Sequence, residues 1–151
     1  MAPAVRLAAR DDFDGLLRCA RAFHAEDGHP LPKAGEVALA ALLDTNSPHG
    51  RALVLDTEGG IAGYAVLCFG YSVEFGGRDA FVDDLYVAPA LRAKGHGRRM
   101  MERLAGLARA EGCHALHLEV FTGNPMADWY KSLGFDRRGS LMSKRFEPLN
   151  D

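Results

Sequence analysis

Residues 92–98 read Arg-Ala-Lys-Gly-His-Gly-Arg and combine two glycines with a concentration of positive charge. The segment follows an apolar, strand-like stretch that ends at Val87 and precedes a helical pattern over residues 98–111. A loop at a helix N-terminus presents unpaired N–H groups and the positive end of the helix dipole, and glycines let the backbone approach a ligand. The segment therefore predicts a phosphate-binding loop, with a strand-to-helix turn that binds nothing as the competing interpretation.

The order of the residues in this loop excludes two well-known phosphate loops. A dinucleotide fingerprint needs a third glycine three positions after the second, but that position is Met100. A Walker loop needs Gly-Lys-Ser/Thr, whereas here Lys94 precedes Gly95 and no hydroxyl residue follows. The expected ligand is therefore a different phosphate compound.

The apolar pattern surrounds this loop with both strands and helices. The expected elements are a strand at 5–9, helices at 13–23 and 36–44, strands at 52–55, 61–73 and 80–87, a helix at 98–111, a strand at 116–121, a helix at 126–133 and strands at 135–138 and 141–146. This order predicts a single α/β (α+β) domain over residues 1–151. Its mixed central sheet should hold six to seven strands, with about four helices around it.

Composition and charge narrow the class of protein. A chain of 151 residues, 48% hydrophobic and 25% charged, can build one core without disulfides. The net charge of -2 indicates neither a nucleic acid nor a membrane partner. Positive charge is local, because residues 92–111 hold six basic and two acidic groups (+4), whereas residues 1–91 hold seven and thirteen (-6).

The cysteines and histidines indicate neither a disulfide framework nor a metal site. Three cysteines, an odd number in apolar or helical patterns, favour reduced thiols and a cytoplasmic location. No segment has the length of a signal peptide core or of a membrane span. Strand periodicity sends His114 and His117 to opposite faces, and no Cys-x-x-Cys accompanies them, so we predict no metal.

Three blocks, taken with the order of the elements, resemble the GNAT superfamily of acyl-CoA-dependent N-acetyltransferases. Residues 82–89 are similar to the central strand of the family, with an acidic residue near its start. Residues 92–97 match its pyrophosphate loop, Arg/Gln-x-x-Gly-x-Gly/Ala. Residues 118–120, Asn124 and residues 130–135 look like its last core strand and the following helix.

The resemblance implies acetyl-CoA as the acyl donor and implies the residues that bind it. Backbone amides of the loop would hold the pyrophosphate, and the central strand would pair with the pantetheine arm. The family's parallel strands part to admit the thioester, which implies a gap between residues 86–87 and residues 116–121. The implied cofactor-binding residues are Leu85, Tyr86, Val87, Arg92, Ala93, Lys94, Gly95, His96, Gly97, Arg98 and Asn124.

The same resemblance implies two catalytic residues. An alkylamine with a pKa near ~10.4 must lose a proton before it attacks a thioester. Asp83 matches the acidic position of the family by its distance from Arg92 and would relay that proton through water, while strand periodicity places Asp84 on the opposite face. Tyr130 would donate a proton to the departing thiolate. The competing interpretations are a strand-end charge at Asp83 and an aromatic residue packing beside Trp129.

The acceptor is predicted to be the primary amine of a small molecule. Residues 61–87 look most like the spermidine/spermine and related diamine acetyltransferases. Glu26, Asp27 and Asp84 are candidate acceptor-binding residues, and the negative charge of residues 1–91 favours a cationic acceptor. The alternatives are a protein or peptide N-acetyltransferase and a non-catalytic acyl-CoA sensor, and a homodimer is left open.

Overall fold

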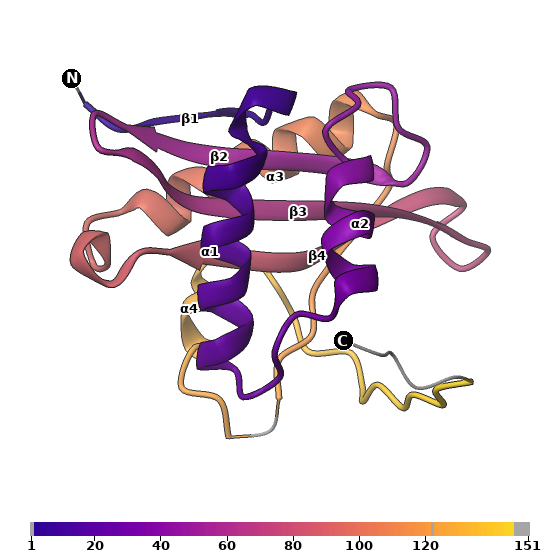
Figure 1. Ribbon diagram of the computed structural model, residues 1–151. Helices are drawn as coiled ribbons and strands as arrows, with labels where there is room; N and C mark the ends of the chain where they lie inside the picture. Colours follow the sequence, from indigo (N-terminus) through magenta and orange to yellow (C-terminus); the bar gives the residue numbers. More distant parts are fainter. Residues whose placement is uncertain (1, 122, 147–151) are drawn as a thin grey trace.

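A five-stranded mixed sheet forms the centre of the protein (Figure 1). The computed structural model describes residues 2–121 and 123–146. The strands are β1 (Ala4–Leu7), β2 (Gly50–Thr57), β3 (Gly60–Ser72), β4 (Gly77–Val87) and β5 (Leu116–His117). They lie side by side in chain order, with β1 to β4 antiparallel and β5 parallel to β4. The expected mixed sheet and α+β class are therefore confirmed.

Four α-helices cover the two faces of this sheet and one of its edges. They are α1 (Phe13–Glu26), α2 (Lys33–Ala41), α3 (His96–Ala110) and α4 (Ala127–Ser132). Figure 1 shows α1 and α2 on one face and α3 on the other. The expected number of helices is confirmed over the described part of the chain. Within that same part, no helix combines the length and the apolar character needed to cross a membrane.

Strand alternation divides the apolar residues into two cores. On β3, Tyr64 and Val66 pack toward α1 and α2, whereas Ala65 and Leu67 pack toward α3. All four are buried, as expected for a strand covered on both faces. Burying a side chain as large as Leu67 contributes about 1.5 to 3 kcal/mol, so these two layers hold the helices in place on the sheet.

The expected count of six to seven strands is wrong for the described residues. The strand expected at 116–121 is reduced to β5, and residues 135–146 contain no strand. A strand needs a neighbour to pair its backbone groups, and β5 offers only two residues. Apolar alternation near the C-terminus therefore yields exposed side chains at Leu141, Met142 and Phe146 instead of a sixth strand.

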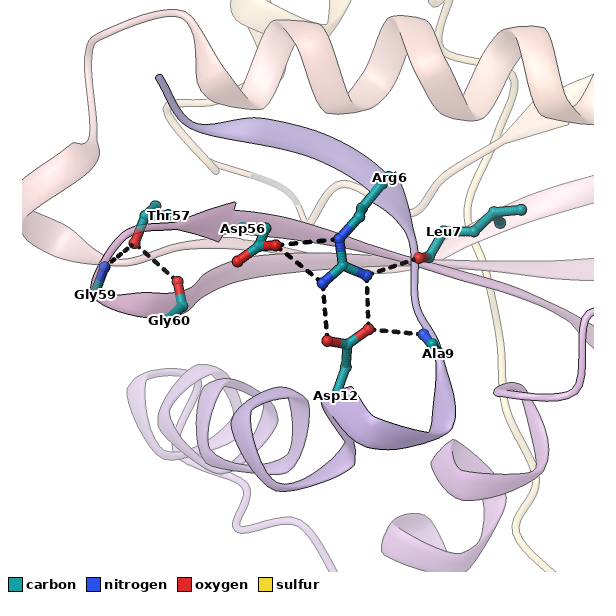
Figure 2. A network of polar contacts seen from close by, with 8 residues as sticks. All are labelled: Arg6, Leu7, Ala9, Asp12, Asp56, Thr57, Gly59 and Gly60. Atoms are coloured by element: carbon teal, nitrogen blue, oxygen red, sulfur yellow. Dashed lines mark hydrogen bonds and ion pairs between the residues drawn. The ribbon is translucent and has the colours of Figure 1, made fainter. Parts of the chain in front are cut away.

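An arginine on β1 ties together the first strand, the second strand and the beginning of α1 (Figure 2). Arg6 donates two hydrogen bonds to the Asp12 carboxylate, at 2.7 and 2.9 Å, and two to Asp56 at 3.0 and 3.2 Å. Asp12 also accepts the N–H of Ala9 at 2.7 Å. The guanidinium of Arg6 holds the pKa of the Asp12 carboxyl below its usual value. This network sets where α1 enters the fold, and thus where its far end meets the sheet.

The first prediction concerns this network. A carboxyl with a lowered pKa stabilises the fold above its unfolded pKa of ~3.9, and this contribution is lost as the pH falls through the folded pKa. Because Arg6 is partly exposed, we expect Asp12→Asn to cost only about 1 to 2 kcal/mol at pH 7. Thermal denaturation from pH 7 to pH 3 should show the gap to wild type closing below about pH 4.

The matched control is Asp11→Asn, which changes a neighbouring exposed carboxylate. It should leave the melting temperature at pH 7 nearly unchanged. A gap between wild type and Asp12→Asn that stays constant down to pH 3 would contradict the electrostatic origin of the effect.

Candidate active site

The loop before α3 adopts a backbone that only small residues tolerate easily. Gly95 is the N-cap residue of α3 and has a left-handed backbone with φ 86°. Ala93 is also left-handed, with φ 62°. A side chain at φ > 0 is disfavoured by contact with the backbone, so the glycine at position 95 makes this turn accessible. The turn exposes the loop and leaves the first N–H groups of the 15-residue helix α3 without partners inside the helix.

Arg92 connects the loop to the end of α1. Its Nη2 lies 2.9 Å from both carboxylate oxygens of Glu26, and its Nε donates to the carbonyl of Val87 at 2.7 Å. The guanidinium carbon lies 5.5 Å from the centre of the Tyr86 ring. The structure therefore places Arg92 against Glu26, a candidate acceptor-binding residue, while Asp27 lies exposed next to it at the end of α1.

The other side chains of the loop point in different directions. His96 is buried, with its Nδ1 3.1 Å from Nη1 of Arg99. Arg98 lies 3.7 Å from the Glu102 carboxylate, and Lys94 is exposed. His96 can therefore offer a ligand its backbone but not its ring, whereas Lys94 and Arg98 can offer charge.

One edge of β4 is open beyond its first residues. β4 pairs with β3 along its whole length, but with β5 only at Ala80–Leu116 and Phe81–His117. Residues 82–87 therefore have no strand partner on the β5 side within the described chain. The side chains of Leu85 and Val87 pack on the α3 side and Tyr86 packs on the α1 side. A ligand at this edge would accordingly meet backbone groups, as the family resemblance implies.

A β-bulge at Asp83 places Asp83 and Asp84 on the same face of the strand, not on opposite faces as expected. Val66 pairs with Asp84 and Leu67 with Val82, so Asp83 is the extra residue of the strand. Val82 and Leu85 both pack toward α3. The two residues between them therefore both lie toward α1. The prediction of opposite faces was wrong, because a period of two holds only in an unbroken strand.

Asp84 and Asp83 differ in what they contact. The Asp84 carboxylate accepts a hydrogen bond of 2.7 Å from the Tyr64 hydroxyl and lies 3.1 Å from Nε2 of His24 on α1. Asp83 has no hydrogen-bond partner among residues 2–121 and 123–146. Surrounding protein atoms desolvate its carboxyl and, together with the charge of Asp84, raise its pKa.

Tyr130 on α4 lines a cavity of about 650 Å³ at the β5 edge of the sheet. Its ring packs edge-on against Trp129 and Phe135, and burial raises the pKa of its hydroxyl. Trp129 in turn lies 3.6 Å from where a Cβ on Gly97 would stand. The structure thus brings the helix of Tyr130 against the beginning of α3.

Asn124 has a local structural function. Its Oδ1 accepts the N–H of Met126 at 2.8 Å, and its carbonyl accepts the N–H of Ala127 at 3.2 Å. These contacts begin α4, the helix that carries Tyr130.

Sequence reasoning missed one polar pair. The buried carboxylate of Asp79 on β4 lies 2.9 Å from Nε2 of His117 on β5. The sequence pattern marks His117 only as a possible metal ligand, and no group of three metal-binding side chains occurs within the described ranges. The residues lie 38 positions apart, so only the parallel register of β4 and β5 could have predicted the contact.

Residues 16–135 match the family model described as acetyltransferase (GNAT) family. The chain belongs to the GNAT acetyltransferase family. The expected membership is therefore confirmed, and the family uses acyl-CoA as the donor.

The relatives differ in coverage. Thialysine N-epsilon-acetyltransferase of Sus scrofa is 32% identical over 113 residues, which cover 74% of this chain and 55% of that protein. The Bos taurus enzyme of the same name is 37% identical over 75 residues, covering 49% and 44%. The chain thus spans about half the length of these relatives.

Solved structures resemble nearly the whole chain. An integron cassette protein from the mobile metagenome of Cole Harbour Salt Marsh is 32% identical, with a TM-score of 0.83 over 95% of this chain and 91% of its own. An aminoglycoside N-acetyltransferase solved in complex with CoA has a TM-score of 0.81 at 14% identity, covering 95% and 94%. The second likeness concerns the fold alone.

The residues of the loop and of the β4 edge fit acetyl-CoA. The left-handed turn at Gly95 exposes N–H groups for a pyrophosphate, and Lys94 and Arg98 carry positive charge beside them. The open backbone of residues 82–87 adjoins this loop in the chain. The loop and the β4 edge therefore form a suitable site for the donor that this family uses.

The second prediction tests the loop. Gly95→Val forces a β-branched residue into a left-handed backbone, at a cost of about 1 to 2 kcal/mol, and should displace the N–H groups. We expect the Kd for acetyl-CoA, measured by calorimetry, to rise about tenfold.

The matched control is Gly106→Val in the middle of α3, where a Cβ meets no heavy atom within 4 Å. It should keep the wild-type Kd. Equal affinity in all three proteins would move the CoA site away from this loop.

Proposed function

We propose that this protein is an N-acetyltransferase that transfers the acetyl group of acetyl-CoA to the primary amine of a small molecule. The observation that carries the proposal is the basic loop at the beginning of α3, which continues from the open edge of β4 and contacts the helix of Tyr130. Binding of the donor, access of the thioester and protonation of the leaving group then occur in neighbouring parts of the fold.

Tyr130 has the properties of a general acid. Burial raises the pKa of its hydroxyl, so the phenol keeps its proton at neutral pH. Acetyl-CoA supplies an activated acyl group on a sulfur leaving group. Tyr130 donates its proton to that sulfur as the carbon–sulfur bond breaks, and recovers a proton released by the attacking nitrogen. The alternative, a purely structural aromatic residue, requires no hydroxyl.

The aspartates of β4 suit a cationic acceptor. Asp83 and Asp84 lie on the same side of the bulged strand, and among the described residues Asp83 has no ion-pair partner. Glu26 is paired with Arg92, so it contributes less field than its charge suggests. Asp83 can attract an ammonium group and help to remove its proton through water. Similarity to thialysine N-epsilon-acetyltransferases, whose names specify a small amine, supports this acceptor class.

The direct test of the proposal is a screen of amines with acetyl-CoA that reads the release of free thiol. We expect thiol release with at least one small primary amine and a matching acetylated product by mass spectrometry. Binding of acetyl-CoA without thiol release for any amine or peptide would instead indicate an acyl-CoA sensor. Release with peptides alone would indicate a peptide N-acetyltransferase.

The third prediction concerns Tyr130. Tyr130→Phe keeps the ring and removes the proton donor, so kcat should fall by about 10² to 10⁴ while the Kd for acetyl-CoA stays within about twofold. Tyr71→Phe, at a tyrosine that is 84% exposed in the β3–β4 hairpin, is the matched control and should leave kcat unchanged. A Tyr130→Phe enzyme with wild-type kcat would show that the phenol is structural.

The fourth prediction concerns the charge of the acceptor. Because Asp83 and Asp84 concentrate negative charge on one side of β4, kcat/KM should be higher for a diamine than for a neutral aminoalcohol or an amino acid. Raising the ionic strength should lower the diamine value and leave the aminoalcohol value nearly constant, because salt screens accessible charges. A preference for the amino acid, or a diamine rate independent of salt, would contradict a cationic acceptor.

A further inference from the structure

The Asp79–His117 pair lies outside the residues assigned above to the donor, the acceptor or the leaving group. The side chain of Asp79 is 7% exposed, and its Oδ2 lies 2.9 Å from Nε2 of His117. Its Oδ1 is buried without a hydrogen-bond partner in the described structure. A buried carboxylate bonded only to one imidazole costs stability, because the desolvation of its charge is only partly offset.

The surroundings of the pair are shaped to hold it. A Cβ on Gly70 would stand 2.6 Å from Oδ1 of Asp79, so the glycine leaves room for the carboxylate. The His117 ring contacts two aromatic rings, with its centre 5.0 Å from that of Phe75 and 4.8 Å from that of Phe81. The ring is thereby fixed in one orientation, with Nε2 toward the carboxylate.

The carboxylate also selects the tautomer of the histidine. A carboxylate only accepts hydrogen bonds, so the ring nitrogen facing Asp79 carries the hydrogen. The other nitrogen, Nδ1, then has a free lone pair. An imidazole with one nitrogen held by a buried aspartate and the other free is the arrangement of a general base.

His117 lines the same cavity as Tyr130 and lies on the same face of the sheet as Asp83. It pairs with Phe81, which stands opposite Cys68 in the layer facing α1. Asp83 follows Phe81 by two residues on β4, so the side chains of His117 and Asp83 start from neighbouring places on this face. A small amine between them can approach both.

We propose that His117 is a further catalytic residue, the base that finally receives the proton which the acceptor ammonium loses beside Asp83, and that Asp79 is its positioning residue. This inference rests on the proposed function. His117 Nδ1 accepts one proton from the ammonium, and the neutral nitrogen then forms its bond to the acetyl carbon as the carbon–sulfur bond breaks. The nitrogen loses its second proton, which replaces the one that Tyr130 gives to the sulfur. His117 returns its proton to solvent after turnover.

Other charged groups also face this cavity and contribute to its field. They are Glu119 after β5, Lys131 on α4, and Asp136, Arg137 and Arg138 in the segment that follows α4. Arg138 is itself paired with Glu74 of the β3–β4 hairpin. The test therefore compares two acceptors of different basicity in the same cavity, where these groups are the same for both.

The experiment compares two acceptors and two variants, and is the fifth prediction. With an alkylamine of pKa near ~10.4, His117→Gln should lower kcat/KM by about 10² to 10⁴. With an amine that is already neutral at the assay pH, the same variant should lose less than about fivefold, because no proton needs to be removed first. His114→Gln, at an exposed histidine three residues earlier, is the matched control and should behave as wild type with both.

A second measurement does not depend on activity. Nitrogen NMR of the histidine rings in the ligand-free protein should show His117 protonated on Nε2, and Asp79→Asn should weaken that preference. Equal losses for the two acceptors, no loss with the alkylamine, or a hydrogen on Nδ1 of His117 would overturn the proposal. Absence of thiol release by the wild-type protein would overturn the proposed function instead, and the proposal with it.

Discussion

The candidate site depends on how β4 is held. This strand is paired with β3 from end to end but with β5 at only two residue positions, so one side is fixed while the other is open from residue 82 onward. An open backbone edge in the middle of a fold is costly unless a ligand or solvent satisfies its N–H and C=O groups. The bulge at Asp83 stands where this opening begins and turns two neighbouring carboxylates toward α1. In the proposed function, access for the donor and negative charge for the acceptor thus have one structural origin.

The helices packed around β4 place their ends next to this open edge. The Arg6 network fixes the beginning of α1 (Figure 2). The other end of that helix brings His24 to Asp84 and Glu26 to Arg92. Behind the sheet, α3 begins at Gly95 directly after the loop and is held by buried Met100 and other apolar residues. Both helices therefore contribute residues at their ends to the candidate site, while the apolar residues in their central turns pack against the sheet.

Much of the fold and part of the site could be predicted from the sequence, and the limits have physical causes. The turn at 92–98 before a helix could be predicted, because glycines, charge and position are read from adjacent residues, and its role as a phosphate-binding loop stays a prediction. The bulge was missed, because register is decided between strands and not within one. The strand expected at 141–146 has suitable alternation but no neighbour. The Asp79–His117 contact joins two strands across 38 residues and follows only from their register.

The central claim is that the open edge of β4 receives the donor, and hydrogen exchange tests it most directly. Peptides covering residues 82–87 should exchange their open-edge amides quickly in the free protein and become protected when acetyl-CoA is saturating, because the donor then occupies that edge. Peptides from β2, which is paired on both sides, should change little. Binding of acetyl-CoA with no added protection in residues 82–87 would contradict the account.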